Sequence, residues 1–301
     1  MPLSMEFKNG FVNLVEAKVK KGVVSVKNTH TVAISDEWFD SSGITNVSDL
    51  HLLLKQELEL MQFKEKECYL CINNTSIIYR ELLVPQLDAK KLPLLIRSEM
   101  MDVLNLTPDY IMDYVIIEEI FNEETNEDNY RVLAVAMQQS AIESFIELCK
   151  LLKLKLVSID SATNSVLKIV SLNPEIVSKE QVILADVGSG HLRLYLFEQG
   201  KYVLSRNTRL ISYSDSRREE IIGVVEDNIN KMIQFSYTRG LKSGIKQIVL
   251  FGNDELLHEV KDRVLEGLIV PCEIFEKPEF IEIEGEFQTR YLNAYGTLLR
   301  K

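Results

Sequence analysis

In the first third of the chain, some segments have a strand-like pattern of apolar and polar residues, and another has apolar residues at helical spacing. Residues 6–17 and 22–34 have strand-like sequences and are separated by Lys20-Lys21-Gly22, which is typical of a β-hairpin. Residues 47–60 instead carry apolar side chains at helical spacing, and Ser48 is expected to cap that helix. Residues 66–79 return to a strand pattern. This part of the chain is predicted to be strands, a helix and a further strand.

Residues 82–160 are predicted to form a small inserted module. A short edge strand ends at Pro85, and a helix with apolar faces follows. Two strands then flank the polar tract Asn122–Asn129, which is typical of a hairpin tip. A helix at 140–152 and a strand at 155–160 complete the module. Its predicted order is strand, helix, strand, strand, helix, strand.

The second half of the chain is predicted to open with three strands between Gln181 and Leu210. A helix is expected at 161–169, before these strands, and His191 is expected at an exposed strand position because HLRLYLF alternates. The remaining expected elements are a long amphipathic helix at 216–237, a strand at 247–251, a helix at 255–265, a strand at 273–275 and a closing helix at 291–300.

Charge and hydropathy exclude several function classes. The chain of 301 residues has 34 basic and 45 acidic residues and a formal charge of −11, whereas nucleic-acid binding needs a basic face. No apolar run approaches the length of a membrane span, and the start has no signal-peptide anatomy. We therefore expect a cytoplasmic protein that reaches a membrane only through a protein partner.

The four cysteines fit a reducing compartment. Cys68 and Cys71 spell C-x-x-C within an apolar strand, where residues three apart point to opposite faces. No second C-x-x-C or nearby histidine completes a zinc site. Both are expected to be buried structural residues.

The turn Asp186-Val187-Gly188-Ser189-Gly190 carries the clearest candidate chemistry. It leads from a strand into a strand, so it is neither a Rossmann nor a P-loop pattern. Its glycines could bring backbone N–H groups around a phosphate, and Asp186 could hold a hydrated Mg²⁺. The same residues also make ordinary hairpins. The motif alone leaves both interpretations open.

In order and spacing, the whole chain resembles the PilM family of type IV pilus assembly proteins, the FtsA/PilM branch of the actin-like superfamily. The matching segments include FVNLVEAKVKKGVVSVKNTHTVAI, ELLVPQLDAKKLPLLIRSEMMDVLNLTPDYIMDYVIIEE, VILADVGSGHLRLYLFEQGKYVLSRNTRL and NAYGTLLR. The resemblance implies an α/β, ribonuclease H-like duplicated fold. The implied domains are 1–81 with 161–179 and the returning helix 290–301, the inserted β-α-β-β-α-β subdomain 82–160, and the second domain 180–289.

The resemblance also implies partners. Proteins of this family bind the cytoplasmic tail of the membrane protein PilN and contact pilus assembly ATPases, and self-association into a homo-oligomer is left open. The chain is therefore expected to be a scaffold and not an enzyme. The expected partner groove in the inserted module is lined by Leu92, Leu95, Ile96, Met100, Val115 and Val135.

The nucleotide-binding positions implied by the resemblance are only partly kept. In the first phosphate loop, Glu6, Lys8, Gly10 and Asn13 stand where the family has Asp, Gly, Ser and Lys. The second loop keeps Asp186, Gly188, Ser189 and Gly190, and the third keeps Gly252 followed by Asn253. Two interpretations remain: weak binding of ATP, with Mg²⁺ held by Asp186, or a nucleotide-free scaffold.

Two other classes share the fold. Small-molecule kinases need intact loops on both domains, and the altered first loop counts against them. Division proteins of the FtsA type end in an amphipathic membrane helix, whereas this sequence stops at Leu298–Lys301, directly after the closing helix. We therefore expect no such tether.

Overall fold

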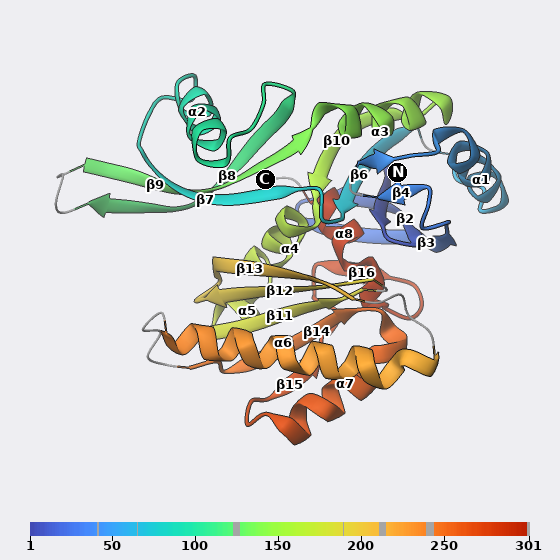
Figure 1. Cartoon of the computed structure of the whole chain (residues 1–301). Coiled ribbons are helices and arrows are strands. Elements are labelled where there is room, and N and C mark those ends of the chain that lie inside the picture. The colour runs from blue at the N-terminus through green and yellow to red at the C-terminus, as the bar shows by residue number, and fades with distance from the viewer. Residues whose placement is uncertain are drawn as a thin grey trace. The chain divides into compact units, whose positions relative to one another are not determined.

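The computed structural model describes all residues except 41, 65, 123–126, 189, 211–214, 239–243 and 300–301. The chain divides into two compact units (Figure 1). Unit 1 comprises residues 1–35, 56–73 and 154–301, and unit 2 comprises residues 36–55 and 74–153. The bounds of the three domains expected from the sequence stay predictions.

Unit 1 contains a six-stranded sheet in the order β10-β6-β1-β2-β3-β16. β1, β2 and β3 are antiparallel, whereas β6, β10 and β16 pair in parallel with their neighbours. All six residues of β1 are buried, as expected for a central strand that is covered on both faces. The strands are β1 Leu3–Lys8, β2 Phe11–Lys20, β3 Val23–Ala33, β6 Glu67–Asn73, β10 Lys155–Ser161 and β16 Ile281–Ile283.

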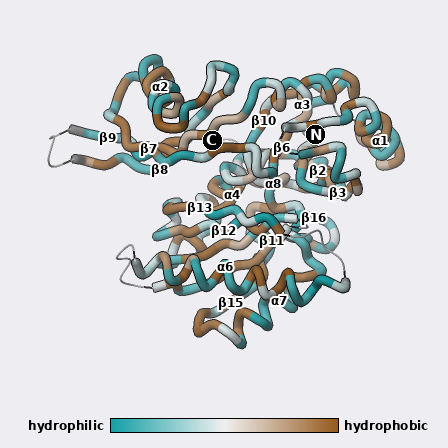
Figure 2. The backbone as a smooth tube through the Cα atoms, viewed as in Figure 1, coloured by the Kyte–Doolittle hydropathy of each residue, from teal (hydrophilic) through white to brown (hydrophobic). Residues whose placement is uncertain are grey.

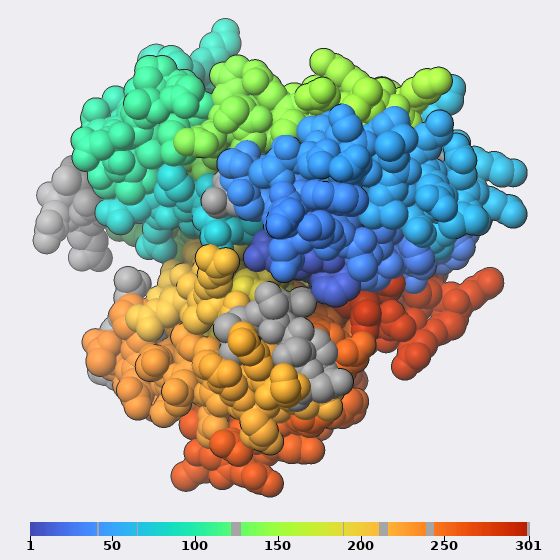
Figure 3. All heavy atoms as spheres, turned by 45° about the vertical axis from the view of Figure 1, so that its right-hand side comes forward, coloured from blue at the N-terminus to red at the C-terminus, as the bar shows by residue number. Residues whose placement is uncertain are grey.

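Two helices pack against each other and tie the chain's last segment to this sheet. α4 (Ala162–Ser171) begins after Ser161, whose hydroxyl accepts a hydrogen bond from the Asn164 N–H at 3.2 Å. α8 (Leu292–Leu298) contacts α4, β1 and β6. Gly296 allows this close approach, because a Cβ there would lie 2.5 Å from the Ser165 carbonyl oxygen. Residues near the two ends of the chain consequently lie side by side (Figure 3).

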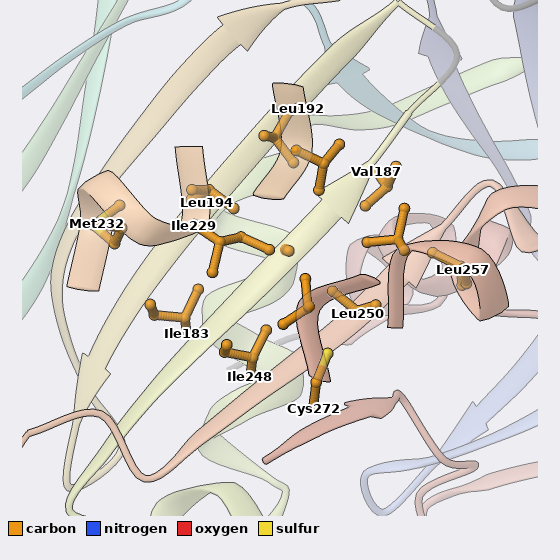
Figure 4. Packing of buried hydrophobic residues seen from close by; sticks show 14 of the residues in the cluster. Ile183, Val187, Leu192, Leu194, Ile229, Met232, Ile248, Leu250, Leu257 and Cys272 are labelled. Carbon is orange, nitrogen blue, oxygen red and sulfur yellow. The ribbon is translucent and has the colours of Figure 1, made fainter. Parts of the chain in front are cut away.

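Unit 1 also contains a five-stranded sheet in the order β13-β12-β11-β14-β15. Its strands are β11 Gln181–Val187, β12 His191–Glu198, β13 Lys201–Arg209, β14 Gln247–Gly252 and β15 Cys272–Ile274. Two helices, α6 (Arg218–Thr238) and α7 (Asp254–Gly267), cover it, and apolar and polar residues are interspersed along α6 (Figure 2). Figure 4 shows the resulting core, a single cluster that includes Ile183, Leu194, Ile229, Leu250 and Leu257.

Unit 2 is built on a three-stranded antiparallel sheet in the order β7-β9-β8. One face packs against α2, and the core between them includes Leu82, Val132 and Ala134. The elements of the sheet and its helix are β7 Ile78–Pro85, α2 Leu92–Leu104, β8 Tyr110–Asn122 and β9 Glu127–Gln138. The chain also forms β4 Phe39–Asp40, β5 Gly43–Ile44, α1 Val47–Leu60 and α3 Gln139–Leu151.

Several expected elements differ from those observed. The segment 6–17 is two strands, because Asn9-Gly10 forms a turn in which Gly10 has φ 76°. The segment 66–79 is likewise interrupted between β6 and β7. Asn46, and not Ser48, caps α1, since its side-chain oxygen accepts the Asp49 N–H at 3.1 Å.

The expected last strand of the inserted module belongs elsewhere. Residues 155–160 lie in β10, which pairs in parallel with β6 in the six-stranded sheet of unit 1. Three short strands and two short helices had no recognisable sequence pattern: β4, β5, β16, α5 (Pro174–Val177) and η1 (Asp215–Arg217). The closing helix begins as η2 (Thr289–Tyr291), and its expected end at residue 300 lies outside the described residues.

Candidate functional site

Two buried carboxylates from the two sheets of unit 1 face each other. Glu6 in β1 has no exposed surface, and Asp186 near the end of β11 is 2% exposed. Asn73 Nδ2 donates to Glu6 Oε1 at 3.0 Å and to Asp186 Oδ2 at 3.1 Å. Asn293 Nδ2 donates to the same two oxygens at 2.8 and 3.1 Å. We call these four residues the amide bridge.

Strand register explains why these residues meet. Lys8 at the end of β1 pairs with Asn73 at the end of β6, and parallel strands bring their carboxyl ends to one edge of the sheet. α8 supplies Asn293 from the other end of the sequence. The amide orientation follows from chemistry, because an ionised carboxylate only accepts hydrogen bonds and must face the NH₂ group. Neither asparagine is recognisable from the sequence alone, since an Asn at a strand end or on a short helix carries no motif.

Asn13, which stands where the family has a phosphate-binding lysine, also uses its side-chain amide for hydrogen bonds within the protein. It lies opposite Glu6 in the β1–β2 ladder and is fully buried. Its Nδ2 donates to Glu6 Oε2 at 2.9 Å and to the Arg290 carbonyl at 2.8 Å. Its Oδ1 accepts from the Thr31 hydroxyl at 2.9 Å. Asn13 thus extends the amide bridge and does not point to a ligand.

His191 is buried, which corrects the expectation that it is exposed. Both faces of β12 are covered, so alternation along HLRLYLF does not expose one side, and His191 is 5% exposed. Its Nε2 lies 3.7 Å from Asp186 Oδ2, a distance that allows charge attraction but not a hydrogen bond. Its ring also fills the space beside Gly188, where a Cβ would lie 2.3 Å from Cε1.

The charge of Asp186 is strongly stabilised. Burial alone would raise the pKa of this carboxyl, but the His191 side chain, the Lys8 ammonium and the Asn293 amide lower its pKa to about 2. Lys8 is itself buried, at 7% exposed. Asp186 is therefore a carboxylate at neutral pH, held by groups of the protein itself.

The three loops expected to hold a nucleotide lie close together and contact one another. Gly190 in the second loop is close to Asn9 in the first, since a Cβ on Gly190 would lie 3.5 Å from Asn9 Cβ. Gly252 in the third loop has φ +117°, and a Cβ there would lie 2.6 Å from the Val187 carbonyl oxygen and 2.9 Å from Asp186 Oδ1. Asn253 precedes α7 without a side-chain capping bond. Ser189 lies outside the described residues.

One cavity among the described residues of this region is small. A cavity of about 110 Å³ lies between Lys8, Asn13, Asn253 and Arg290. Arg290 is paired with Asp254 at 2.7 Å. Pockets for drug-sized ligands and cofactors usually measure about 300–1,000 Å³. The cavity therefore has room for water or a small ion in this arrangement.

The donor set in this arrangement does not match a Mg²⁺ site. Mg²⁺ needs oxygen ligands, whereas two NH₂ groups lie between the Glu6 and Asp186 carboxylates. In the part of the chain that the structure describes, no group of three or more His, Cys, Asp or Glu residues could hold a metal ion. Cys68 and Cys71 are buried free cysteines, as expected.

The residues expected to line a partner groove fall into two groups. Leu92, Ile96 and Met100 are at most 3% exposed and form the core between α2 and the sheet, so they are not accessible to a groove. Leu95 is half-buried and packs against that core. Val115 and Val135 are half-buried on the opposite face of the sheet, because their neighbours Tyr114 and Ala134 face α2.

That opposite face is partly apolar and accessible. Leu83 is 58% exposed and Ile111 is 44% exposed, and both point away from α2 because the residues beside them, Leu82 and Met112, pack toward it. We call Leu83, Ile111, Val115 and Val135 the outer face of the module. Among the described residues, no helix is long and apolar enough to cross a membrane.

A family model described as "Type IV pilus assembly protein PilM" matches residues 5–211. The fold is similar to that of a solved "PilM-PilN type IV pilus biogenesis complex", with a TM-score of 0.77, 13% identity and coverage of 98% of this chain and 97% of that chain. None of the curated proteins matches the chain.

Two further solved structures share the fold at low identity. The cytoplasmic domain of EpsL, an inner-membrane component of the type II secretion system of Vibrio cholerae, gives a TM-score of 0.54 at 9% identity, covering 100% of this chain and 95% of that chain. A Bacteroides thetaiotaomicron protein described as having an actin-like ATPase fold gives 0.51 at 12% identity, covering 91% and 90%. The expected actin-like fold is confirmed.

Proposed function

Because the chain belongs to the PilM family of type IV pilus assembly proteins, we propose that it is a scaffold of a pilus assembly machine that binds the cytoplasmic tail of a PilN-like membrane protein. The observation that carries the proposal is the family match over residues 5–211, together with the likeness in fold to a PilM-PilN complex along 98% of the chain. On this proposal the chain is recruited to the inner face of the cell membrane by its partner, and it contacts the assembly ATPases.

The outer face of the module is the proposed docking surface for the tail. Leu83 and Ile111 offer exposed apolar surface there, and half-buried Val115 and Val135 continue it. β8 is an edge strand of 13 residues, so an extended peptide could also add to its free backbone groups. This surface replaces the sequence-based groove of Leu92, Ile96 and Met100, which are buried under α2.

The proposed scaffold works with weak or no ATP binding. The proposal is supported by the amide bridge, by the His191 ring beside Gly188 and by the cavity of about 110 Å³. The retained glycines have a structural explanation, since a side chain on Gly188 or Gly252 would collide with its neighbours. Residues that look like a nucleotide motif in the sequence would then be kept for packing.

A binding titration tests the tail site. The probe is a labelled peptide with the sequence of the cytoplasmic tail of the PilN-like protein encoded beside this chain, measured by fluorescence anisotropy with the full chain. Leu83→Asp should weaken binding by about ten-fold, because it places a charge on the apolar surface. Leu94→Asp is the matched control, since Leu94 is 68% exposed on α2, away from the outer face. Equal binding by all three proteins would place the tail site elsewhere.

A thermal titration with Mg-ATP tests the nucleotide proposal separately. A ligand at 100 times its Kd stabilises a protein by about 2.7 kcal/mol, which shifts the melting temperature measurably. We expect no shift at millimolar Mg-ATP. A saturable shift that is lost in Asp186→Asn would favour the alternative, an ATP-binding actin-like ATPase or a kinase of the same fold.

A further inference from the structure

A second and larger cavity lies in unit 1, at the end of the six-stranded sheet opposite the amide bridge. Its volume is about 550 Å³. Glu67 and Tyr69 at the start of β6 line it, as do residues at the end of β2, whereas Asn73 lies at the other end of β6. The ends of α4 and α8 close the cavity on its other side. Neither the expected nucleotide site nor the outer face of the module includes these residues.

The floor of this cavity is apolar. Leu298 and Leu299 line it and are each 3% exposed, so they form its floor. Leu172, at the end of α4, is 43% exposed and lies at the rim. An apolar side chain that entered here would exchange water for three leucines, which is favourable in proportion to the area it buries.

The rim carries an unbalanced positive charge. Among the lining residues, Lys168 is paired with Asp160 at 2.6 Å, and Glu67 is paired with Lys155 at 2.8 Å. Lys18 and Lys21 also line the cavity and are exposed. Neither forms an ion pair with any residue that the structure describes. Two uncompensated cations at one cavity contrast with the net charge of −11 of the chain.

We propose that this cavity binds a segment of another protein that carries acidic residues beside a large apolar side chain. The apolar side chain would occupy the leucine-lined floor, and the carboxylates would face Lys18 and Lys21 at the rim. An apolar anchor surrounded by a charged, solvated rim is the usual anatomy of a protein interface. Because most of the surface of this acidic chain repels an acidic segment, the lysine pair also provides selectivity.

The lining favours a protein segment over a small polar metabolite. Sites for small molecules converge several polar groups on the ligand. Here the Ser171 hydroxyl already donates to the Lys168 carbonyl at 2.9 Å, and Lys168 and Glu67 are paired with other residues. The cavity thus has an apolar floor and two free charges, which suit an anchor residue with flanking acids. This surface is in unit 1, so the proposal does not depend on tail binding by unit 2.

The test uses the full chain and a short fluorescein-labelled peptide in which Leu-Phe is flanked by two glutamates on each side. We expect saturable binding by fluorescence anisotropy, weakened at least about ten-fold in K18E/K21E because two attractions become repulsions. Leu172→Asp should weaken binding through the apolar rim, and rising salt should weaken it by screening. The control K179E/K231E makes the same change of charge at two exposed lysines that do not line the cavity, and it should bind as the parent does.

Three outcomes would overturn the proposal. The first is no binding of the acidic peptide, and the second is equal binding by K18E/K21E and K179E/K231E. The third is saturable binding of decanoate in place of the peptide, which would make this a site for a small amphiphilic anion. Melting curves of each variant separate loss of the site from loss of the fold, and the lysines are exposed, so no unfolding is expected.

Discussion

The amide bridge of unit 1 and the outer face of unit 2 differ in exposure: the polar groups of the bridge are buried, whereas the apolar groups of the outer face are exposed to solvent. In the amide bridge, Glu6, Asp186, Asn73 and Asn293 are at most 3% exposed and hydrogen-bond with one another. On the outer face, Leu83 and Ile111 are 58% and 44% exposed. Buried polar groups that hydrogen-bond with one another stabilise a fold. Apolar groups left in water instead favour association, because covering them with a partner lowers the free energy. The two regions therefore divide stability and binding between them.

The largest expected effect comes from removing one amide of the bridge. Asn293→Leu keeps a similar volume but leaves Glu6 Oε1 and Asp186 Oδ2 with one donor fewer each. We expect the free energy of unfolding to fall by about 3 kcal/mol or more, as for other broken buried charge networks. Urea unfolding measures it. Asn207→Leu on β13, where Asn207 is exposed, is the control and should stay within about 0.5 kcal/mol. A loss for Asn293→Leu as small as the control's would mean that water satisfies the carboxylates.

Acid should weaken the same region in a defined window. The pKa of Asp186 is about 2 in the folded chain, against an ordinary value of 3.8, so its contribution is complete above pH 4 and is lost as pH falls toward 2. The expected loss is about 2 kcal/mol, measured by urea unfolding at a series of pH values. Asp186→Asn cannot titrate at this position and should lose correspondingly less over the same window. Parallel curves for the two proteins would contradict the assignment.

Two glycine substitutions in the second loop test its packing against His191 through the free energy of unfolding. A Cβ on Gly188 would lie 2.3 Å from the His191 ring, so Gly188→Ala should cost about 1–3 kcal/mol. Gly190→Ala is the matched control, because its Cβ would make an ordinary contact with Asn9 at 3.5 Å. Adding His191→Ala to Gly188→Ala should recover part of the loss in a double-mutant cycle. Equal losses at both glycines would instead indicate a general requirement of the turn.

The smallest effect on stability is expected on the outer face. Leu83→Asp changes a side chain that is 58% exposed, so the free energy of unfolding should change by at most about 0.5 kcal/mol. The same variant should still bind the tail about ten-fold more weakly. Urea unfolding beside the anisotropy titration checks both values on one protein. A large loss of stability would mean that this face is part of the core and would remove the contrast with the amide bridge.

Local patterns predicted elements better than they predicted the amide bridge. The span 47–60 is helical as expected, because its apolar spacing is local information. β16 was not recognised, because a strand of three residues gains its identity only by pairing with β3. His191 was assigned to the surface because alternation assumes one solvated face, and β12 has none. The amide bridge joins residues from β1, β6, β11 and α8, so no window of the sequence contains it.

The hydrogen bond between Asn293 and Glu6 joins residues 287 positions apart, and this has a consequence for biosynthesis. The ribosome adds Asn293 287 residues after Glu6. Until then, Glu6 lacks one of its three amide donors, and β3 lacks the strand that pairs with it from residues 281–283. Unit 1 therefore cannot complete its fold until residue 293 has been made, whereas the sheet of unit 2 uses residues 78–138 and can form earlier during translation.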